Sequence, residues 1–403
     1  MSRELPYCQI TACRLCGSQD LEEVWNLGEQ WVVDFLVEGQ EGFKAPLVVV
    51  LCRACGLAQL KHTVDRDLMY TNYWYRSGTS ETMRAALKNT VEGALARLGH
   101  HPRIVCDIGA NDGTLLGFLP RVTERIAFEP AKNIQVANAT QVYHDYFTRI
   151  ATPYWHNRVD LAFSVAMFYD VSDPLLFIEN IGWLLRKNGI WVCQQNFVGP
   201  VMRDNTFDFL SHEHVTLWSL PVFLKTVAKA GLETFDLEEL PLNGGTYRVY
   251  VGKKGQHQVS RVVAEYLARD GEYDSAGAWR EFKQRVEDNG VRLRQILADI
   301  KARGKTVAVL GASTRGNSLL QTYGLGGADL PYASDRDPKK WGKTMVGTGI
   351  PIISEEEARQ RKPDYFLVLP YSYVEQIKTR EKDFLNRGGH LIVPLPTAMI
   401  LEA

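Results

Sequence analysis

The chain has 403 residues and a formal net charge of −1, and this length predicts two or three domains. Its 45% hydrophobic and 23% charged residues are ordinary for a globular protein and leave no basic field to attract nucleic acid or an anionic membrane. The first residues lack the apolar core of a signal peptide, and no apolar run approaches the roughly 20 residues of a membrane span. We therefore expect a cytoplasmic enzyme that acts on a small molecule, and the sequence is compatible with a monomer.

Two C-x-x-C-G turns are the first motif along the chain. Cys13 and Cys16 belong to one turn, and Cys52 and Cys55 belong to the other. Four thiolates from two such turns can hold one zinc ion, and a closed four-cysteine site without an open position is structural. Four free thiols or a redox pair are the alternative. We predict that residues 1–66 form a zinc-binding module.

An aromatic segment, residues 68–80, follows the predicted module. Three tyrosines and a tryptophan fall within six positions of it. The segment is either an aromatic hinge that packs two domains together or a lid that carries Tyr73 and Tyr75 over a substrate. An amphipathic helix is predicted from Ser80 to Leu98.

The sequence R-I-V-C-D-I-G-A-N-D-G-T-L-L of residues 103–116 predicts a buried strand, a glycine turn and a helix that starts at Thr114. Such a unit opens a doubly wound sheet, whose ligands bind at the carboxyl ends of the strands. A second short strand ends at Glu129, where a carboxylate suits a ribose diol. The pattern D-x-G-x-N-D-G resembles motif I of class I S-adenosylmethionine methyltransferases; the alternative is a glycine turn followed by a surface acid. The candidate cofactor-binding residues are Asp107, Gly109, Asn111, Asp112, Gly113, Glu129, Pro130 and Met167.

Further elements complete this predicted sheet. Strands are expected at Val159–Val165 and at Ile190–Gln195, with a helix that starts at Asp173-Pro174 between them. A strand pair at 233–240 and 246–252 surrounds Asn243-Gly-Gly245, and a closing antiparallel pair is typical of class I methyltransferases. We assign residues 67–255 to this domain.

The sequence His212-Glu213-His214 lies between the fifth strand and the strand pair. It is expected just beyond the carboxyl edge of the sheet, where a doubly wound fold performs its chemistry. One histidine could act as a general base. A polar surface loop is the first alternative; metal binding is the second, although H-E-H lacks the i, i+4 spacing of H-E-x-x-H.

Residues 256–403 are expected to form a helical linker and a second Rossmann-like α/β domain. Two helices are predicted at Val259–Asp270 and Ala278–Arg303. Residues 305–316 again predict a strand followed by a glycine turn. This turn either packs against its neighbours or binds phosphate through its amides and Arg315.

These motifs together resemble one family, the S-adenosylmethionine-dependent C-methyltransferases of deoxysugar biosynthesis, across nearly the whole chain. The family combines paired C-x-x-C turns, D-I-G-x-N-D-G, F-E-P, H-E-H and a C-terminal G-A-x-x-K-G. It also carries D-x-x-P-x-K-x-G and P-G-T-x-I-P, which appear here as residues 335–342 and 346–351. The resemblance implies a class I methyltransferase fold, S-adenosylmethionine as cofactor and structural zinc. It implies methylation at C-3 of a nucleotide-linked 4-keto sugar. It also implies that the C-terminal domain contributes to binding this sugar.

The resemblance also implies roles for individual residues. His214 is the first candidate for the base that forms an enolate, and His212 is the second. Glu213 would orient a histidine or hold a sugar hydroxyl, and Tyr75 or Tyr73 would donate to the enolate oxygen. Three positions depart from the family, because Ser211, Asp170 and Arg315 stand where it often has Tyr, His and Lys. The candidate substrate-binding residues are Asn196, Ser211, Arg315, Asp335 and Lys340.

Two competing functions fit the same motifs. An O- or N-methyltransferase of a small metabolite would carry the same cofactor site. A zinc-ribbon binding protein with an inactive Rossmann unit is the third reading, against which the complete cofactor turn and its acid argue.

Overall fold

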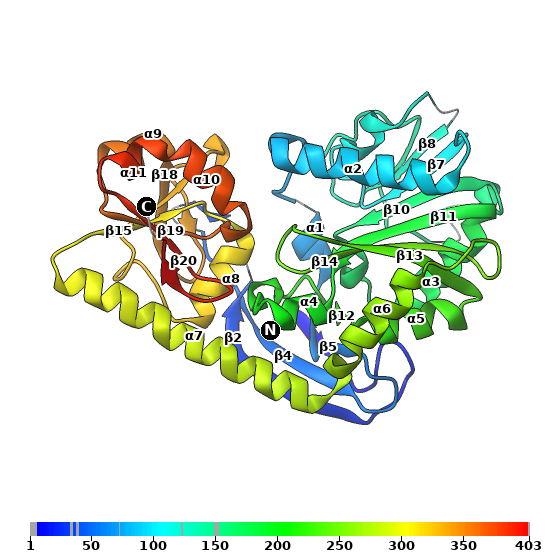
Figure 1. Cartoon of the computed structure of the whole chain (residues 1–403), viewed down its shortest axis with the longest axis horizontal. Coiled ribbons are helices and arrows are strands. Elements are labelled where there is room, and N and C mark those ends of the chain that lie inside the picture. Colours follow the sequence, from blue (N-terminus) through cyan, green and yellow to red (C-terminus); the bar gives the residue numbers. More distant parts are fainter. Residues whose placement is uncertain are drawn as a thin grey trace, which may run out of the picture.

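The computed structural model describes residues 6–32, 35–37, 40–71, 73–121, 124–148 and 153–401. Three large sheets lie within these residues (Figure 1), and we call them the N-terminal, middle and C-terminal sheets. The long helix α7 (Ala276–Ala302) runs across the N-terminal strands β2 and β4 to the C-terminal sheet. No helix in the described ranges combines the length and apolar composition that crossing a bilayer requires.

The middle sheet has seven strands in the order β13-β14-β11-β10-β7-β8-β9. All neighbours are parallel except β14, which is antiparallel to both β11 and β13. This doubly wound sheet with one reversed strand confirms the predicted class I methyltransferase fold. The strands are β7 (Ile104–Ile108), β8 (Glu124–Phe128), β9 (Gln141–Tyr143), β10 (Val159–Val165), β11 (Leu185–Asn196), β13 (Leu232–Leu240) and β14 (Thr246–Lys253).

The helices that cover the middle sheet start at the capping residues that the sequence predicts. Ser80 caps α2 (Glu81–Leu98), and Asp173 caps α3 (Pro174–Leu184) by accepting from the amide of Leu176. The predicted helix from Thr114 is wrong in type, because only a 3₁₀ turn, η2 (Leu115–Phe118), forms before Pro120. The residue before a proline is driven to extended backbone, which ends the helix early. Other elements of this part are η1 (Ser77–Thr79), η3 (Pro153–Trp155), η4 (Phe168–Asp170), α4 (Val198–Arg203), η5 (Phe207–Phe209) and α5 (Leu220–Lys229).

The N-terminal sheet has the order β12-β5-β4-β2, and one of its strands comes from the middle of the chain. Strand β12 (Thr216–Leu217) follows the H-E-H sequence and pairs with β5 (Ala58–Leu60). The segment that carries the candidate base is therefore fixed to the zinc-binding module. The remaining elements are β2 (Leu21–Trp31), β4 (Lys44–Cys52), the pair β1 (Tyr7–Gln9) and β6 (His62–Val64), and α1 (Arg66–Tyr70).

The C-terminal sheet is Rossmann-like, as predicted, with five parallel strands in the order β20-β19-β15-β16-β18. Strand β3 (Phe35–Leu36) of the N-terminal module extends it by pairing with β17 (Thr344–Met345). The N-terminal module thus contacts both the middle and the C-terminal parts. We propose domain boundaries near residues 66 and 255. The other strands are β15 (Val307–Leu310), β16 (Ala333–Asp335), β18 (Ile350–Ser354), β19 (Tyr365–Val368), β20 (His390–Val393) and β21 (Met399–Ile400).

Helices of the C-terminal part surround that sheet. The linker helices predicted at 259–270 and 278–303 are α6 (Arg261–Asp270) and α7. The glycine turn after β15 leads into α8 (Thr314–Thr322), which Ser313 caps by accepting from the amide of Gly316. The other elements are η6 (Gly271–Asp274), η7 (Pro338–Lys340), α9 (Glu355–Gln360), η8 (Tyr371–Tyr373), α10 (Val374–Arg380) and α11 (Lys382–Asn386).

Candidate active site

The four predicted cysteine ligands form one cluster. The Sγ atoms of Cys13, Cys16, Cys52 and Cys55 all lie within 4.8 Å of one another, with two pairs at 3.6 Å. Four sulfurs about 2.3 Å from one tetrahedral ion have about this separation. In each turn the amide after the second cysteine, from Gly17 or Gly56, donates to the carbonyl of the first cysteine. The cluster fits a closed, structural zinc site.

The cofactor turn, residues 109–113, depends on left-handed backbone. Gly109, Asn111 and Gly113 have φ of +73°, +51° and +75°. A Cβ on Gly113 would lie 1.9 Å from the carbonyl oxygen of Ala137, and one on Gly109 would lie 3.0 Å from Cγ of Met167. These glycines are therefore required by the packing of the turn itself, a reason that the motif did not predict.

Glu129 closes the cofactor site at the carboxyl end of β8. Its carboxylate is buried and accepts from the amides of Asn111 at 2.7 Å and Ala131 at 2.8 Å. Burial raises the pKa of Glu129, and the two amide donors partly offset this. A carboxylate has about four lone-pair positions, so two remain for a ribose diol. The oriented acceptor beside the glycine turn fits S-adenosylmethionine.

Asp107 lies beside Glu129 at the end of β7. Burial raises the pKa of Asp107 to about 8, and the neighbouring charges of Glu129 and Asp112 add to this effect. The carboxyl group is therefore largely protonated at neutral pH and can donate a hydrogen bond. Pro130 follows Glu129 directly at the same edge.

Replacing Glu129 by Ala should weaken S-adenosylmethionine binding about tenfold or more, because a hydrogen bond to a charged acceptor contributes about 1.5–3 kcal/mol. Titration calorimetry measures the affinity, and thermal unfolding separates lost binding from lost structure. Glu124→Ala is the matched control, since Glu124 begins the same strand at its opposite end and its side chain accepts only from Thr140 among the described residues. Equal affinity in wild type and Glu129→Ala would remove the residue from the cofactor site.

The aromatic segment packs on the cofactor turn. The amides of Ser77 and Gly78 donate to the side chains of Asn111 and Asp112 at 3.0 and 2.7 Å, and Asn111 donates back to the carbonyl of Tyr75. Asp112 also accepts from Thr114. These predicted cofactor residues therefore hold the segment in place. These contacts leave both the hinge and the lid as proposals, and Tyr75 remains 44% exposed.

His214 has the geometry of a neutral base. Its ring is buried against Tyr169, with ring centroids 4.0 Å apart, and against Phe209. Nδ1 lies within hydrogen-bond distance of the Phe209 carbonyl. A carbonyl only accepts, so Nδ1 carries the proton and Nε2 keeps a lone pair. Burial lowers the pKa of His214 to about 3, outweighing the Phe209 contact, which raises it.

His212 faces the zinc-binding module instead. Its Nε2 lies 3.0 Å from the carbonyl of Ala45 in β4. Burial lowers the pKa of His212 to about 4. The two histidines of H-E-H are thus directed to different partners, and this arrangement favours His214 over His212 as the base.

Glu213, Asp170 and Tyr73 act on one another electrostatically. Burial raises the pKa of Glu213 to about 7. Burial, and then the charge of Glu213, raise the pKa of Asp170, and the buried Oδ1 of Asp170 has no hydrogen-bond partner among the described residues. The charge of Glu213 is also the main cause that raises the pKa of Tyr73. Tyr73 therefore keeps its proton and can donate a hydrogen bond at neutral pH, and the raised pKa of Asp170 favours its protonated form.

The predicted substrate residues divide between two places. Asn196 ends β11 and donates to the carbonyls of Asn243 and Gly244 in the loop between β13 and β14. Ser211 lies half-buried before H-E-H. In the C-terminal part, the ammonium group of Lys340 contacts Asp335 at 3.0 Å and the Ala312 carbonyl at 2.8 Å. The glycines of the second turn meet Leu369 and Pro370, so packing explains them without a phosphate.

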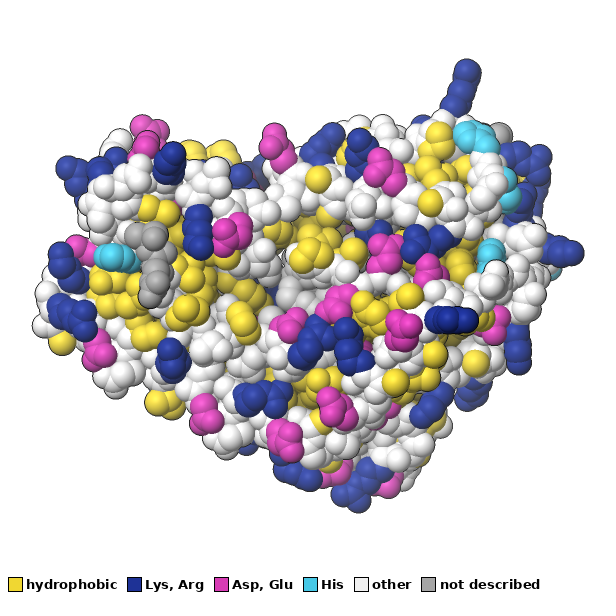
Figure 2. All heavy atoms as spheres, viewed as in Figure 1, with side chains coloured by type: hydrophobic (Ala, Val, Ile, Leu, Met, Phe, Trp, Pro, Cys, Tyr) yellow, Lys and Arg dark blue, Asp and Glu magenta, His cyan; other side chains and the backbone are white. Residues whose placement is uncertain are grey.

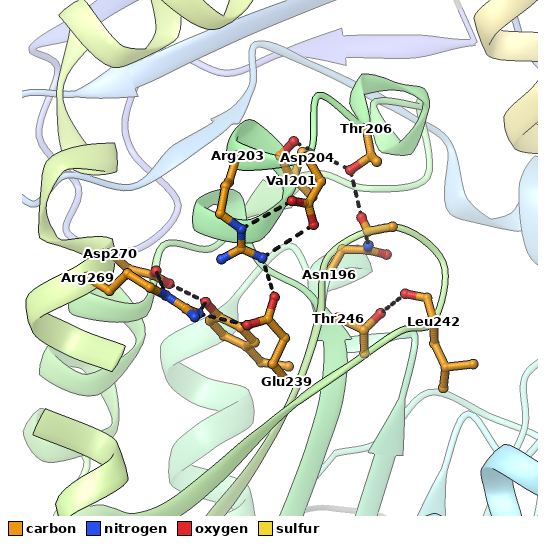
Figure 3. Close-up of polar contacts among 12 residues, drawn as sticks. Asn196, Val201, Arg203, Asp204, Thr206, Glu239, Leu242, Thr246, Arg269 and Asp270 are labelled. Carbon is orange, nitrogen blue, oxygen red and sulfur yellow. Dashed lines mark hydrogen bonds and ion pairs between the residues drawn. The ribbon is translucent and has the colours of Figure 1, made fainter. Parts of the chain in front are cut away.

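A cavity of about 590 Å³ opens at the loop between β13 and β14, where this loop meets the C-terminal part. Arg203 and Arg269 converge on Glu239 at its border (Figure 3), which neutralises the carboxylates there. Figure 2 shows the surface hollowed between the middle and C-terminal parts on this face. The cavity is lined, among others, by Asp204, Thr206, Glu239, Gly244, Tyr371 and Pro396.

The structure adds residues that sequence reasoning missed. Asp208 is 2% exposed and makes a two-point ion pair with Arg315. Tyr371 donates to the same carboxylate at 2.8 Å. An acid between two phenylalanines is the only local signal of a buried, paired carboxylate. Its partners lie more than 100 residues away, so the sequence did not identify them.

The fold, the cofactor turn with Glu129, and the cysteine cluster define an S-adenosylmethionine-dependent methyltransferase with a structural zinc module. Family models agree, since one described as "Putative zinc binding domain" matches residues 13–70 and one described as "C-methyltransferase C-terminal domain" matches residues 241–396. The chain is 30% identical to C-methyltransferase NovU of Streptomyces niveus over 98% of its length and 97% of that protein. It belongs to this family of C-methyltransferases, as the sequence motifs predicted.

Solved structures resemble the middle part more distantly. The Burkholderia thailandensis 1,6-didemethyltoxoflavin-N1-methyltransferase with bound S-adenosylhomocysteine is 17% identical, with a TM-score of 0.34. The match covers 43% of this chain and 80% of that one. The family assignment depends on the full-length relative and not on this likeness.

Proposed function

We propose that the enzyme methylates a carbon next to a ketone, at C-3 of a nucleotide-linked 4-keto deoxysugar, with His214 as the base. The observation that carries this proposal is the buried imidazole of His214, whose Nδ1 lies against the Phe209 carbonyl, an arrangement that leaves the lone pair on Nε2. Removal of a proton from the carbon next to a ketone needs a base. The match to a C-methyltransferase supports carbon as the atom that receives the methyl group.

The reaction needs three contributions from the protein. Nε2 of His214 removes the proton from the carbon, and the electron pair moves onto the ketone oxygen as an enolate. Tyr73 or Tyr75, with the carboxyl group of Asp170, donates a hydrogen bond to that oxygen, and Glu213 orients the histidine or holds a sugar hydroxyl. Asp170 thus takes the place of the family's histidine. Bound S-adenosylmethionine supplies an electrophilic methyl group, and the cofactor turn with Glu129 fixes its position for attack by the enolate carbon.

Sugar recognition is assigned to Asn196, Ser211, Arg315, Asp335 and Lys340. Two N–H groups of Arg315 and one of Lys340 remain after the contacts described, and these suit phosphate oxygens. His212 and Glu213 complete the proposed site, with His212 in a supporting role.

Proton exchange tests the reaction without turnover. Wild-type enzyme, S-adenosylhomocysteine and a nucleoside-diphosphate-linked 4-keto-6-deoxyhexose are incubated in deuterium oxide. Because S-adenosylhomocysteine has no methyl group to transfer, we expect deuterium at one carbon only, the carbon that is methylated when S-adenosylmethionine is present. Mass spectrometry and NMR locate it. Methyl transfer to oxygen or nitrogen without carbon exchange would instead favour the O- or N-methyltransferase.

A further inference from the structure

The C-terminal part reaches the candidate base through one arginine. Arg315, near the start of α8, donates from Nε and one Nη to the two oxygens of Asp208 at 3.0 and 2.8 Å. Asp208 directly precedes Phe209, whose carbonyl holds Nδ1 of His214. A short path of contacts therefore connects α8 to the imidazole.

Asp208 depends on the C-terminal part for all its side-chain hydrogen bonds among the described residues. Its carboxylate is buried and accepts from Arg315 and from Tyr371 of η8. A buried carboxylate without partners is strongly unfavourable, so η5 keeps this conformation only while the C-terminal part is docked.

This contact requires the planar guanidinium group of an arginine. The same guanidinium also donates to the carbonyl of Asn243, while Tyr373 donates to the side chain of Asn243 at 3.2 Å. One planar group thus fastens both η5 and the loop between β13 and β14. A lysine could not bind both Asp208 oxygens in this two-point way.

We propose that Arg315 is a positioning residue for the base. By docking on Asp208 it fixes the Phe209 carbonyl, and this carbonyl holds His214 as the Nδ1–H tautomer with Nε2 free. The inference rests on the proposed function, in which Nε2 removes the proton.

Electrostatics support the same arrangement. The groups around the imidazole are the rings of Tyr169 and Phe209, the neighbouring Glu213, and the guanidinium of Arg315. After burial and the Phe209 contact, Arg315 is the charge that acts on His214, and it lowers the pKa. Loss of this cation should raise the pKa of His214 toward its ordinary value.

NMR of the full-length protein labelled with ¹⁵N-histidine tests the tautomer directly and needs no substrate. The chain has 9 histidines, and His214→Asn identifies the signal of His214. We expect one Nδ1–H tautomer in wild type and mixed tautomers in Arg315→Gln and Asp208→Asn. The pKa of His214 should rise only in Arg315→Gln, which loses the cation. Arg315→Lys keeps the charge and should still show mixed tautomers. Arg361→Gln is the control, because Arg361 is a cation of the C-terminal part that pairs with Glu357 of α9 and not with Asp208.

Exchange kinetics complete the test. Arg315→Lys should lower the maximal exchange rate on the 4-keto-sugar probe in addition to any rise that it causes in KM, whereas loss of an arginine that only binds phosphate would raise KM alone. A single Nδ1–H tautomer in all three variants, or an Nε2–H tautomer in wild type, would overturn the inference. If Arg315→Gln does not fold, the tautomer of His214 in Arg315→Lys tests the inference. Full exchange activity in His214→Asn would refute the assignment of His214 as the base. The NMR spectra would still show whether Arg315 determines the tautomer of His214.

Discussion

Replacing His214 by Asn should abolish both deuterium exchange and methyl transfer while S-adenosylmethionine affinity stays nearly unchanged. Loss of a general base typically lowers the rate by about 10²–10⁴-fold. The cofactor site is built from other elements, the 109–113 turn and the end of β8, so the substitution leaves it intact. Exchange followed by mass spectrometry and calorimetry with the cofactor measure the two quantities separately.

His212→Asn is the matched control for this result. His212 lies two residues away, is equally buried, and bonds to Ala45 of the N-terminal sheet. We expect a lower melting temperature or a higher KM, with exchange retained. Full activity in the His214 variant would refute its assignment, and a reversed pattern between the two variants would make His212 the base.

Removing zinc should unfold the N-terminal module and, with it, the catalytic segment. We expect one zinc per chain by elemental analysis and its loss in Cys52→Ser, whose Sγ is fully buried within the cluster. Structural zinc contributes about 10–16 kcal/mol in small zinc domains. Because β12 pairs with β5 and His212 bonds to β4, the melting temperature and the exchange activity should fall together.

Cys8→Ser is the control for zinc, since Cys8 is exposed and lies outside the cluster. This variant should keep one zinc and the wild-type melting temperature. Wild-type protein that is purified metal-free yet fully folded and active would contradict the structural role.

Local sequence determined the parts of this protein that depend on residues near one another. The spacing of each C-x-x-C-G turn, the strand and glycine turn at 104–113, and the acid at 129 identified the zinc module and the cofactor site. These motifs work because turn geometry and strand direction are set within about ten residues. The helix from Thr114 failed at this level, because Pro120 limits it to a 3₁₀ turn.

Only the tertiary structure decided which surfaces meet. Sequence periodicity gives the buried face of a strand but not its partner, so the pairing of β3 with β17 and of β12 with β5 was not predicted. The requirement for Gly113 follows from the Ala137 carbonyl, and the choice between His212 and His214 follows from two backbone carbonyls on different elements. Asp208 and Arg315 are 107 positions apart, and a buried charge finds such a partner only when the domains have packed together.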